Sequence, residues 1–215
     1  MQLDHLVIAF HDLEKAIADW RSQGFNVLRG GRHPGRTSHN ALVVFEDGSY
    51  IELIAWAEPG PAERWYNMLM QHGEGLMDFA LLPESVPKAI DEAKARGLVL
   101  SGPIDGGRVR PDGRELRWQT ARQATFDIPF LCGDVTPREW RVPEGEARRH
   151  ANGKAGIARV TVAVDDLQAS MKRYEALLGS SALVTGNTIR AGDTTIELVE
   201  KKRPRGEGPD AFELR

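Results

Sequence analysis

One pattern occurs three times along the chain: an apolar strand, a helix with a cap at its start, and a glycine that ends the helix. In the first copy Asp12 is the expected N-cap and Gly24 the expected stop. The apolar positions between them are spaced i, i+3, i+4 and i+7, one face of a helix; they are Leu13, Ala16, Ile17 and Trp20.

The other two copies keep these offsets. In the second, Ser85 is the cap and Gly97 the stop, and in the third Asp166 and Gly179 take these places. Eight residues before the first apolar position of each helix lies a polar residue inside an apolar strand: His5, Asp78 and Arg159. Three such matches are hard to obtain by chance, so we treat them as three units.

Strand pairs follow the helices. Residues 41–45 and 50–56 form an expected hairpin around "EDGS", and "TIRAGDTTIELVE" at 188–200 repeats it, while unit two ends less regularly, with Pro129 in its last strand. Each unit therefore predicts βαβββ, an α+β fold. One unit leaves a sheet face bare, and since adjacent units normally pair, units one and two are expected to form a half-open β-barrel with a cleft.

The domain organisation expected from these units covers the whole chain. Residues 1–142 form one domain from two units, 1–57 and 64–135, with linkers at 58–63 and 142–155; residues 155–200 form a third unit packed beside it, and 201–215 a polar tail.

His5 belongs to the face of its strand that does not cover the helix. Side chains alternate along a strand, so Leu6, Ile8 and Phe10 are expected to face the helix while His5 faces the hollow of the sheet. Glu52, in the last strand of unit one, is costly to bury unless it is paired, hydrated or bound to a cation. If Glu52 also faces the hollow, the two residues line one cleft.

Composition excludes several classes of function. The net charge of −3 gives no general attraction to nucleic acid or to acidic membranes, and no apolar run of 18 residues is present. The single cysteine, Cys132, excludes an internal disulfide and fits a reducing compartment. No signal peptide is seen, so a cytoplasmic location is expected.

At this point the sequence resembles a known family. The repeated unit, with His5 on a first strand and Glu52 on a last strand, is similar to the vicinal oxygen chelate superfamily of glyoxalases, bleomycin-resistance proteins and dioxygenases. The motifs "GGRHPGRTSHNALVVFEDGSYIEL", "RVRPDGRELRW", "IPF" and "HANGKAGI" resemble, more narrowly, the glyoxalase-like domain family, over residues 2–200.

The resemblance implies a metal site in which each of two paired units supplies a first-strand and a last-strand ligand. His5 and Glu52 match the first half and Asp78 the third position, a set for Mn, Fe, Zn or Mg. The fourth position falls near Asp127 to Pro129, where Asp127 alone could bind a metal. The set is incomplete, and His33 or His39 could approach instead. A second interpretation is a hydrogen-bonded His5–Glu52 pair without metal.

Two motifs supply candidate substrate-binding residues. The glycine-rich segment 30–40 and the arginine-rich segment 108–118 are each either an ordinary surface loop or part of the cleft. With the resemblance we favour the cleft for His33, Thr37, Asn40, Arg108, Arg110 and Trp118. Glu52 and His33 are the expected catalytic residues. Arg159 with Glu197 is expected to be a structural ion pair, and His150 either caps the cleft or fixes a linker.

Two hypotheses about function therefore stand. The chain binds a small oxygenated, anionic molecule, and it is either a divalent-metal-dependent lyase, isomerase or dioxygenase or a metal-free binding or sequestering protein. Use of the third unit to pair with another chain, as in a homodimer, is a further possibility. Nothing in the sequence identifies the substrate.

Overall fold

The computed structural model describes residues 1–110, 112–183 and 185–215, and their strands form a sheet of eight and a sheet of four. The elements of unit one are β1 (Gln2–Ala9), α1 (Leu13–Ser22), β2 (Leu28–Arg32), β3 (Ser38–Val44) and β4 (Tyr50–Trp56). An added helix, α2 (Arg64–His72), precedes the βαβββ elements of unit two. These are β5 (Gly75–Leu82), α3 (Val86–Ala95), β6 (Ser101–Val109), β7 (Glu115–Arg122) and β8 (Phe130–Asp134).

A connecting segment and the third unit complete the chain. The connection contains α4 (Arg138–Arg141) and the 3₁₀ turn η1 (Gly145–Arg148). The third unit comprises β9 (Ile157–Val164), α5 (Leu167–Leu178), the 3₁₀ turn η2 (Ser180–Ala182), β10 (Thr188–Ala191), β11 (Thr194–Glu200) and β12 (Gly208–Leu214).

The three predicted helices begin at the predicted caps. The Asp12 carboxylate accepts a hydrogen bond from the Lys15 backbone N–H at 3.0 Å, and Asp166 accepts one from Ala169 at 2.9 Å. Ser85 caps α3 in the same way, through the N–H of Lys88. The α+β fold of repeated βαβββ units is confirmed. Helix α2 was not predicted; it begins where unit two was expected to begin.

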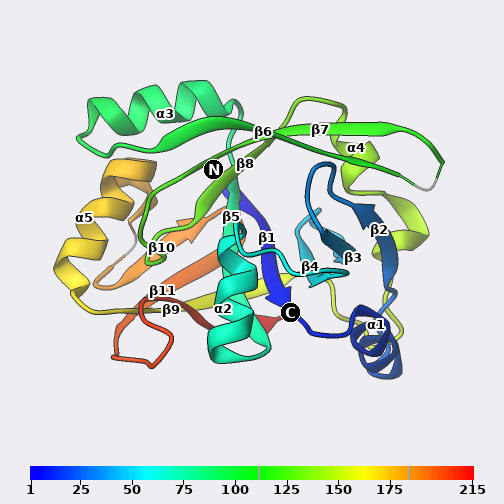
Figure 1. Cartoon of the computed structure of the whole chain (residues 1–215). Helices are drawn as coiled ribbons and strands as arrows, with labels where there is room; N and C mark the ends of the chain where they lie inside the picture. The colour runs from blue at the N-terminus through cyan, green and yellow to red at the C-terminus, as the bar shows by residue number, and fades with distance from the viewer. Residues whose placement is uncertain (111, 184) are drawn as a thin grey trace.

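The eight-stranded sheet joins units one and two into a half-open barrel (Figure 1). Its order is β2-β3-β4-β1-β5-β8-β7-β6, with β1 and β5 antiparallel at the centre. The outer strands β2 and β6 approach each other closely: a Cβ on Gly31 would lie 2.8 Å from the carbonyl oxygen of Val109. Glycine at this position therefore lets the two edges come together around the hollow.

The predicted facing of the first strand is confirmed. Leu6 and Ile8 are buried in the core that the helices cover, and Phe10 packs against it. His5 lies on the opposite face and lines a cavity inside the barrel. Val7 and Ala9 share that face and belong to a separate small apolar cluster.

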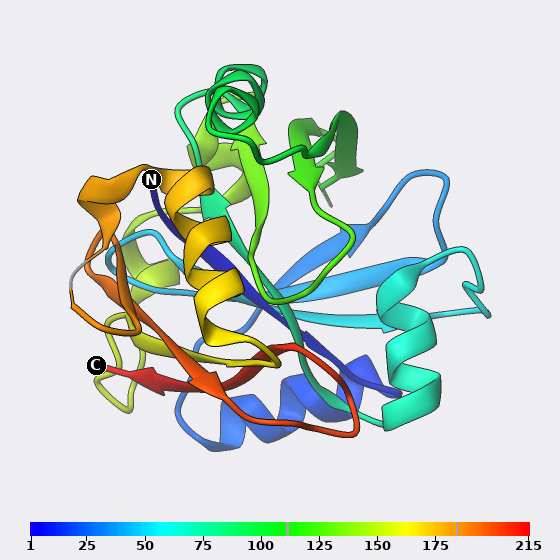
Figure 2. The same cartoon turned by 90° about the vertical axis from the view of Figure 1, so that its left-hand side faces the viewer.

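The four-stranded sheet, in the order β10-β11-β9-β12, lies beside the barrel, and α5 lies next to α3 (Figures 1 and 2). Buried Asp127 of unit two joins the two parts: its carboxylate accepts hydrogen bonds from the Ser170 hydroxyl at 2.8 Å and from Arg173 at 2.6 Å, both on α5. Asp127 is thus a structural residue that lies outside the cavity lining.

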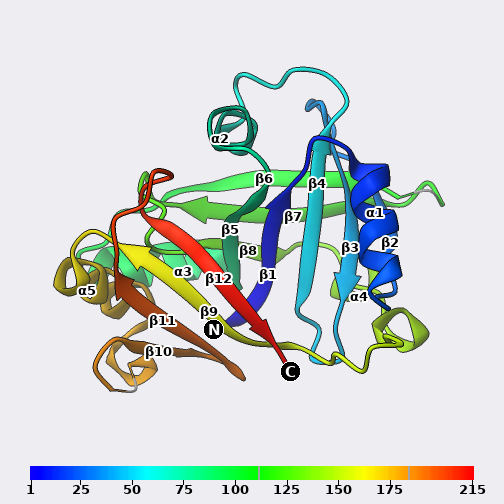
Figure 3. The ribbon, with the colours of Figure 1, turned by 90° about the horizontal axis from the view of Figure 1, so that it is seen from below.

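The segment 201–215 differs from the expected polar tail because it contains β12, which pairs antiparallel with β9 (Figure 3). The β9–β12 pair repeats the β1–β5 pair, including both register shifts. Phe79 lies opposite the residue that follows His5, and Phe212 lies opposite the residue that follows Arg159. Strand β12 therefore occupies in the second sheet the place of β5 in the first.

Arg159 and Glu197 form the expected ion pair, 2.7 Å apart, on this second sheet. In the part of the chain that the structure describes, no helix is both long enough and apolar enough to cross a membrane.

Because Phe212 packs against the core from β12, the Phe212→Ala variant is expected to lower the free energy of unfolding by about 1–3 kcal/mol, less than for a fully buried phenylalanine. Urea denaturation measures this, with the exposed neighbour change Glu213→Gln as a control that stays within about 0.5 kcal/mol. Equal stability of Phe212→Ala and wild type would mean that the segment does not pack as a strand.

Candidate functional site

The barrel encloses a cavity of about 690 Å³, within the range that small-molecule sites occupy. Its wall is formed by both units. Apolar and aromatic side chains cover much of the wall: Leu42, Ile54, Trp65, Leu116, Trp118 and Phe130. Its polar groups include the two residues that the sequence placed together, His5 and Glu52, which the structure brings to one side of the cavity.

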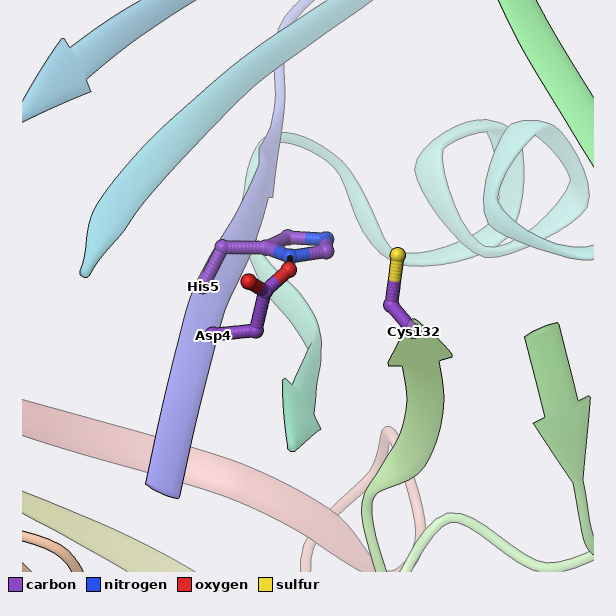
Figure 4. Close-up of side chains that lie close together, drawn as sticks. All are labelled: Asp4, His5 and Cys132. Carbon is purple, nitrogen blue, oxygen red and sulfur yellow. Dashed lines mark hydrogen bonds and ion pairs between the residues drawn. The ribbon is translucent and has the colours of Figure 1, made fainter. Parts of the chain in front are cut away.

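A β-bulge places Asp4 against His5. The pairing of β1 with β5 shifts register between Leu3 and His5, so Asp4 is not paired with any residue of β5. Its side chain turns to the imidazole of His5. The Asp4 carboxylate lies 2.7 Å from Nδ1 of His5 (Figure 4). The contact fixes the ring, which also stacks on Tyr50 with centroids 4.5 Å apart.

Two arginines from the connecting segment neutralise Asp4. Arg141 donates to both Asp4 oxygens, at 2.8 and 3.1 Å, and Arg138 donates at 2.7 Å. Burial raises the pKa of the Asp4 carboxyl, but Arg141, His5 and Arg138 outweigh it and lower the pKa well below its usual value. Asp4 is therefore ionised, so Nδ1 of His5 carries a proton and donates to it, and Nε2 faces the cavity.

Glu52 lies between two imidazoles. One carboxylate oxygen is 3.8 Å from Nε2 of His5, and the other is 3.6 Å from Nε2 of His33. The second oxygen also accepts a hydrogen bond of 2.6 Å from the Asn40 amide. Strands β1, β4 and β3 position His5, Glu52 and Asn40 on the hollow face.

The hydrogen bonds of His33 fix its tautomer as well. The Ser38 hydroxyl donates to Glu63 at 3.0 Å, so Ser38 accepts from Nδ1 of His33, also at 3.0 Å. Burial lowers the pKa of His33, and nearby Arg108 adds to this against the attraction of Glu52. His33 is thus neutral at pH 7; its Nε2, which accepts from the Asn40 amide at 3.5 Å, and Nε2 of His5 both face Glu52. This cluster of acceptors suits a hydrogen-bond donor or a cation.

Arg108 is a buried cation beside this cluster. In the described part of the chain its side chain makes one hydrogen bond, to the carbonyl of Arg141 at 3.3 Å, although a guanidinium has five donors. Gly30 makes room for it: a Cβ there would lie 1.9 Å from the Asn40 amide oxygen and 2.5 Å from the Arg108 guanidinium. The glycine loop thus admits side chains into the cavity.

The other candidate binding residues divide into two groups. Trp118 lines the cavity near His33 and covers Gly106, where a Cβ would lie 2.4 Å from the indole nitrogen. Thr37 and Arg110 do not line it; Thr37 lies against Gly60, and Arg110 donates to the carbonyl of Trp140 at 3.1 Å.

His39 also lies outside the cavity lining, and His150 fixes the linker. The His150 ring bonds the carbonyl of Val44 and accepts from the N–H of Asn26, both at 3.0 Å.

The second half of the expected ligand set is not assembled. Asp78 is buried, and its carboxylate is bound by Arg64 at 2.5 Å and by the indole N–H of Trp65 at 3.0 Å, both from α2. Phe130 takes the place that corresponds to Glu52. Glu52 pairs with the residue two after His5, which is Val7, and Phe130 pairs with the residue two after Asp78, which is Ala80. Asp78 therefore does not join His5 and Glu52.

One group of three potential metal ligands does converge among the described residues: Asp4, His5 and Cys132 (Figure 4). Its chemistry does not fit a cation well. Arginines occupy the Asp4 oxygens, Nδ1 of His5 is protonated, and burial raises the pKa of the Cys132 thiol, which stays protonated. The ligand atoms of His5, His33 and Glu52 are right in kind, but within the described residues they do not all converge to within 4.8 Å of one another as those of the first group do.

The barrel of paired βαβββ units around this cleft defines a vicinal oxygen chelate fold. The model of the family described as glyoxalase-like domain matches residues 3–178, so the chain belongs to that family. No curated protein matches the chain significantly.

Solved structures share the fold at low sequence identity. A hypothetical protein from Staphylococcus aureus matches with a TM-score of 0.72 and 14% identity, over 94% of this chain and 86% of that one. A mutant of 4-hydroxymandelate synthase from Streptomyces coelicolor matches with a TM-score of 0.66 and 15% identity, over 99% and 70%. Methylmalonyl-CoA epimerase from Streptomyces coelicolor, in complex with 2-nitronate-propionyl-CoA, matches at 0.49 and 20%, over 63% and 99%. The first two likenesses show the fold alone.

Arg141→Gln is expected to lower the free energy of unfolding by about 3–5 kcal/mol at pH 7, because it leaves a buried carboxylate short of a partner. The folded-state pKa of Asp4 is depressed, so its stabilisation is complete above its unfolded value and is lost as pH falls through the folded value. The difference from wild type should therefore shrink below about pH 4.

Denaturation curves between pH 7 and pH 2 check this, with the exposed Arg149→Gln as control. A difference that stays constant over this range would contradict the depressed pKa.

Proposed function

We propose that this glyoxalase-like protein binds a small oxygenated, anionic molecule in the barrel cavity. The observation that carries the proposal is the acceptor cluster of His5, Glu52 and His33 beside buried Arg108. A hydroxyl or hydrated carbonyl of the ligand would donate into the cluster. Its carboxylate or enolate oxygen would accept from the unused donors of Arg108.

Glu52 and His33 are the proposed catalytic residues of an isomerase or lyase reaction. Glu52 faces the cavity with one oxygen free of hydrogen bonds from the described residues, so it can take a proton from a carbon or hydroxyl next to a carbonyl group. Arg108 would stabilise the negative oxygen that forms. His33, whose Nε2 lies 3.6 Å from the other Glu52 oxygen, would receive or return the proton, while Asp4 orients His5 toward the ligand.

A divalent metal ion is the second candidate, favoured by the free Nε2 atoms of His5 and His33 that face Glu52. The Asp4–His5 contact is the kind of outer contact that ligating histidines commonly have. Such an ion would act as a Lewis acid, and dioxygenase chemistry would require it. The spread of these atoms and the loss of Asp78 to Arg64 count against a tight site. A cytoplasmic location and a homodimer stay predictions.

A five-carbon hydroxy acid, 2-hydroxyvalerate, is a suitable probe of the first candidate. Calorimetry is expected to show binding in the millimolar range or tighter to wild type, and none to His5→Ala or Arg108→Gln, because each removes a polar group of the cavity wall. The control His39→Ala changes a histidine outside the cavity lining and should bind as wild type does. Unchanged binding by all three variants would contradict the proposed site.

Titration with Mn²⁺, Zn²⁺ and Fe²⁺ separates the two candidates. If the cavity works without metal, wild type and Glu52→Gln should both fail to bind these ions below millimolar concentration, because two or three widely spaced donors hold a cation weakly. Micromolar binding to wild type that Glu52→Gln abolishes would instead support the metal-dependent enzyme.

A further inference from the structure

Arg122, at the end of β7, is a cation of the cavity that the sequence did not single out. It lies in the same row of residues across the sheet as His5. Ala121 pairs antiparallel with Leu131, which puts Arg122 beside Phe130; Phe130 pairs with Ala80, and Ala80 pairs with His5. Two strands, β5 and β8, separate β7 from β1 along this row. Arg122 and the His5–Glu52 cluster therefore line the cavity from different sides.

The charge of Arg122 has no partner within the described residues. No carboxylate or carbonyl oxygen contacts its guanidinium, and its buried Nε atom lacks a hydrogen bond. Arg122 is half-buried, and a partly buried charge costs free energy unless water or a group outside the chain compensates it. Two other arginines, by contrast, have carboxylate partners: Arg141 has Asp4 and Asp134, and Arg64 has Asp78.

Aromatic rings hold this guanidinium in place. Its central carbon lies 5.6 Å from the Phe130 ring and 5.9 Å from the Trp65 ring, so the flat group is fixed while its edges stay available. Burial lowers the pKa of Arg122; the charges of Arg64 and Arg36 add to this, and the carboxylate of Asp78 opposes it. A positive region with unused donors therefore forms this side of the cavity.

The size of the cavity requires a ligand longer than the smallest hydroxy acids. About 690 Å³ corresponds to the liquid volume of roughly twenty water molecules. Between the His5–Glu52 cluster and Arg122 lies Phe130, whose ring contacts the imidazole of His5 edge-on at 5.4 Å. A ligand that reached both sides would thus pass an apolar surface in its middle.

From this arrangement we infer that the ligand carries a second anionic group, a carboxylate or a phosphate, which Arg122 binds. The ligand class is an oxygenated acid with a distal anion: the oxygenated end meets His5, Glu52 and Arg108, an apolar middle crosses Phe130 and Trp65, and the far anion pairs with Arg122. The inference rests on the proposed function, because it adds a second contact to the same cavity.

Matched acids test the inference by calorimetry. The probes are 2-hydroxy diacids of four to seven carbons, the 2-hydroxy monoacids of equal length, and a 2-hydroxy acid with a distal phosphate ester. At least one doubly charged probe is expected to bind wild type at least about tenfold more tightly than its monoacid, the effect of one hydrogen-bonded ion pair. Comparison of the diacids with the phosphate ester tells which anion fits.

The variants assign the effect to Arg122. The advantage of the doubly charged probe should disappear in Arg122→Gln and persist in part in Arg122→Lys, which keeps the charge but not the paired donors. It should be unchanged in Arg114→Gln, an exposed arginine outside the cavity lining. Thermal melts establish that each variant is folded, and Arg122→Lys serves if Arg122→Gln is not.

Three results would overturn the inference. Equal binding of each doubly charged probe and its monoacid to wild type would exclude the distal contact but leave the proposed function in place. An advantage that survives in Arg122→Gln would place the distal contact elsewhere. Failure of every acid to bind wild type at millimolar concentration would overturn both the inference and the proposed function.

Discussion

The geometry of the site depends on one buried carboxylate. Asp4 is fully buried, and two arginines from α4, more than 130 residues away in the chain, keep it ionised. Its contact with Nδ1 decides which nitrogen of His5 faces the cavity. Without the arginines, burial would favour the neutral acid, and Nδ1 would lose its acceptor. The connection between units two and three thus helps to build the site of units one and two.

The two halves of the barrel have the same architecture but different chemistry. Unit one presents His5, Glu52 and Asn40, whereas the corresponding places of unit two carry Asp78, bound by Arg64, then Phe130 and Thr120. The first half is therefore polar and accepts hydrogen bonds, and the second is more apolar and carries two cations, Arg108 beside the unit-one cluster and Arg122 on the other side. A symmetric metal site is replaced by a cavity with two different sides. This asymmetry suits an elongated anionic ligand more than a cation held from both halves.

Local patterns predicted the repeated units because caps, helix faces and glycine stops act over short distances. Alternation along the strand correctly placed His5, but it gave no reason to put Asp4 beside His5, since a bulge cannot be read from alternation. Thr37 was expected to line the cavity, but its neighbour Ser38 does so, which is a difference of one residue along the strand. Arg110 lies just beyond the end of β6, and Arg122 is a charged strand residue without a motif. Strand β12 was missed because its segment is charged and rich in glycine, although its glycine and phenylalanine repeat the spacing of Gly75 and Phe79.

The most direct test of this account is the tautomer of His5, measured by nitrogen-15 NMR at neutral pH. The account predicts that Nδ1 of His5 carries a proton, because ionised Asp4 accepts from it. The Asp4→Asn variant should weaken this preference and shift the Nε2 signal. A proton found on Nε2, with Nδ1 free, would contradict it, since His5 could then offer neither a base nor a ligand atom to the cavity.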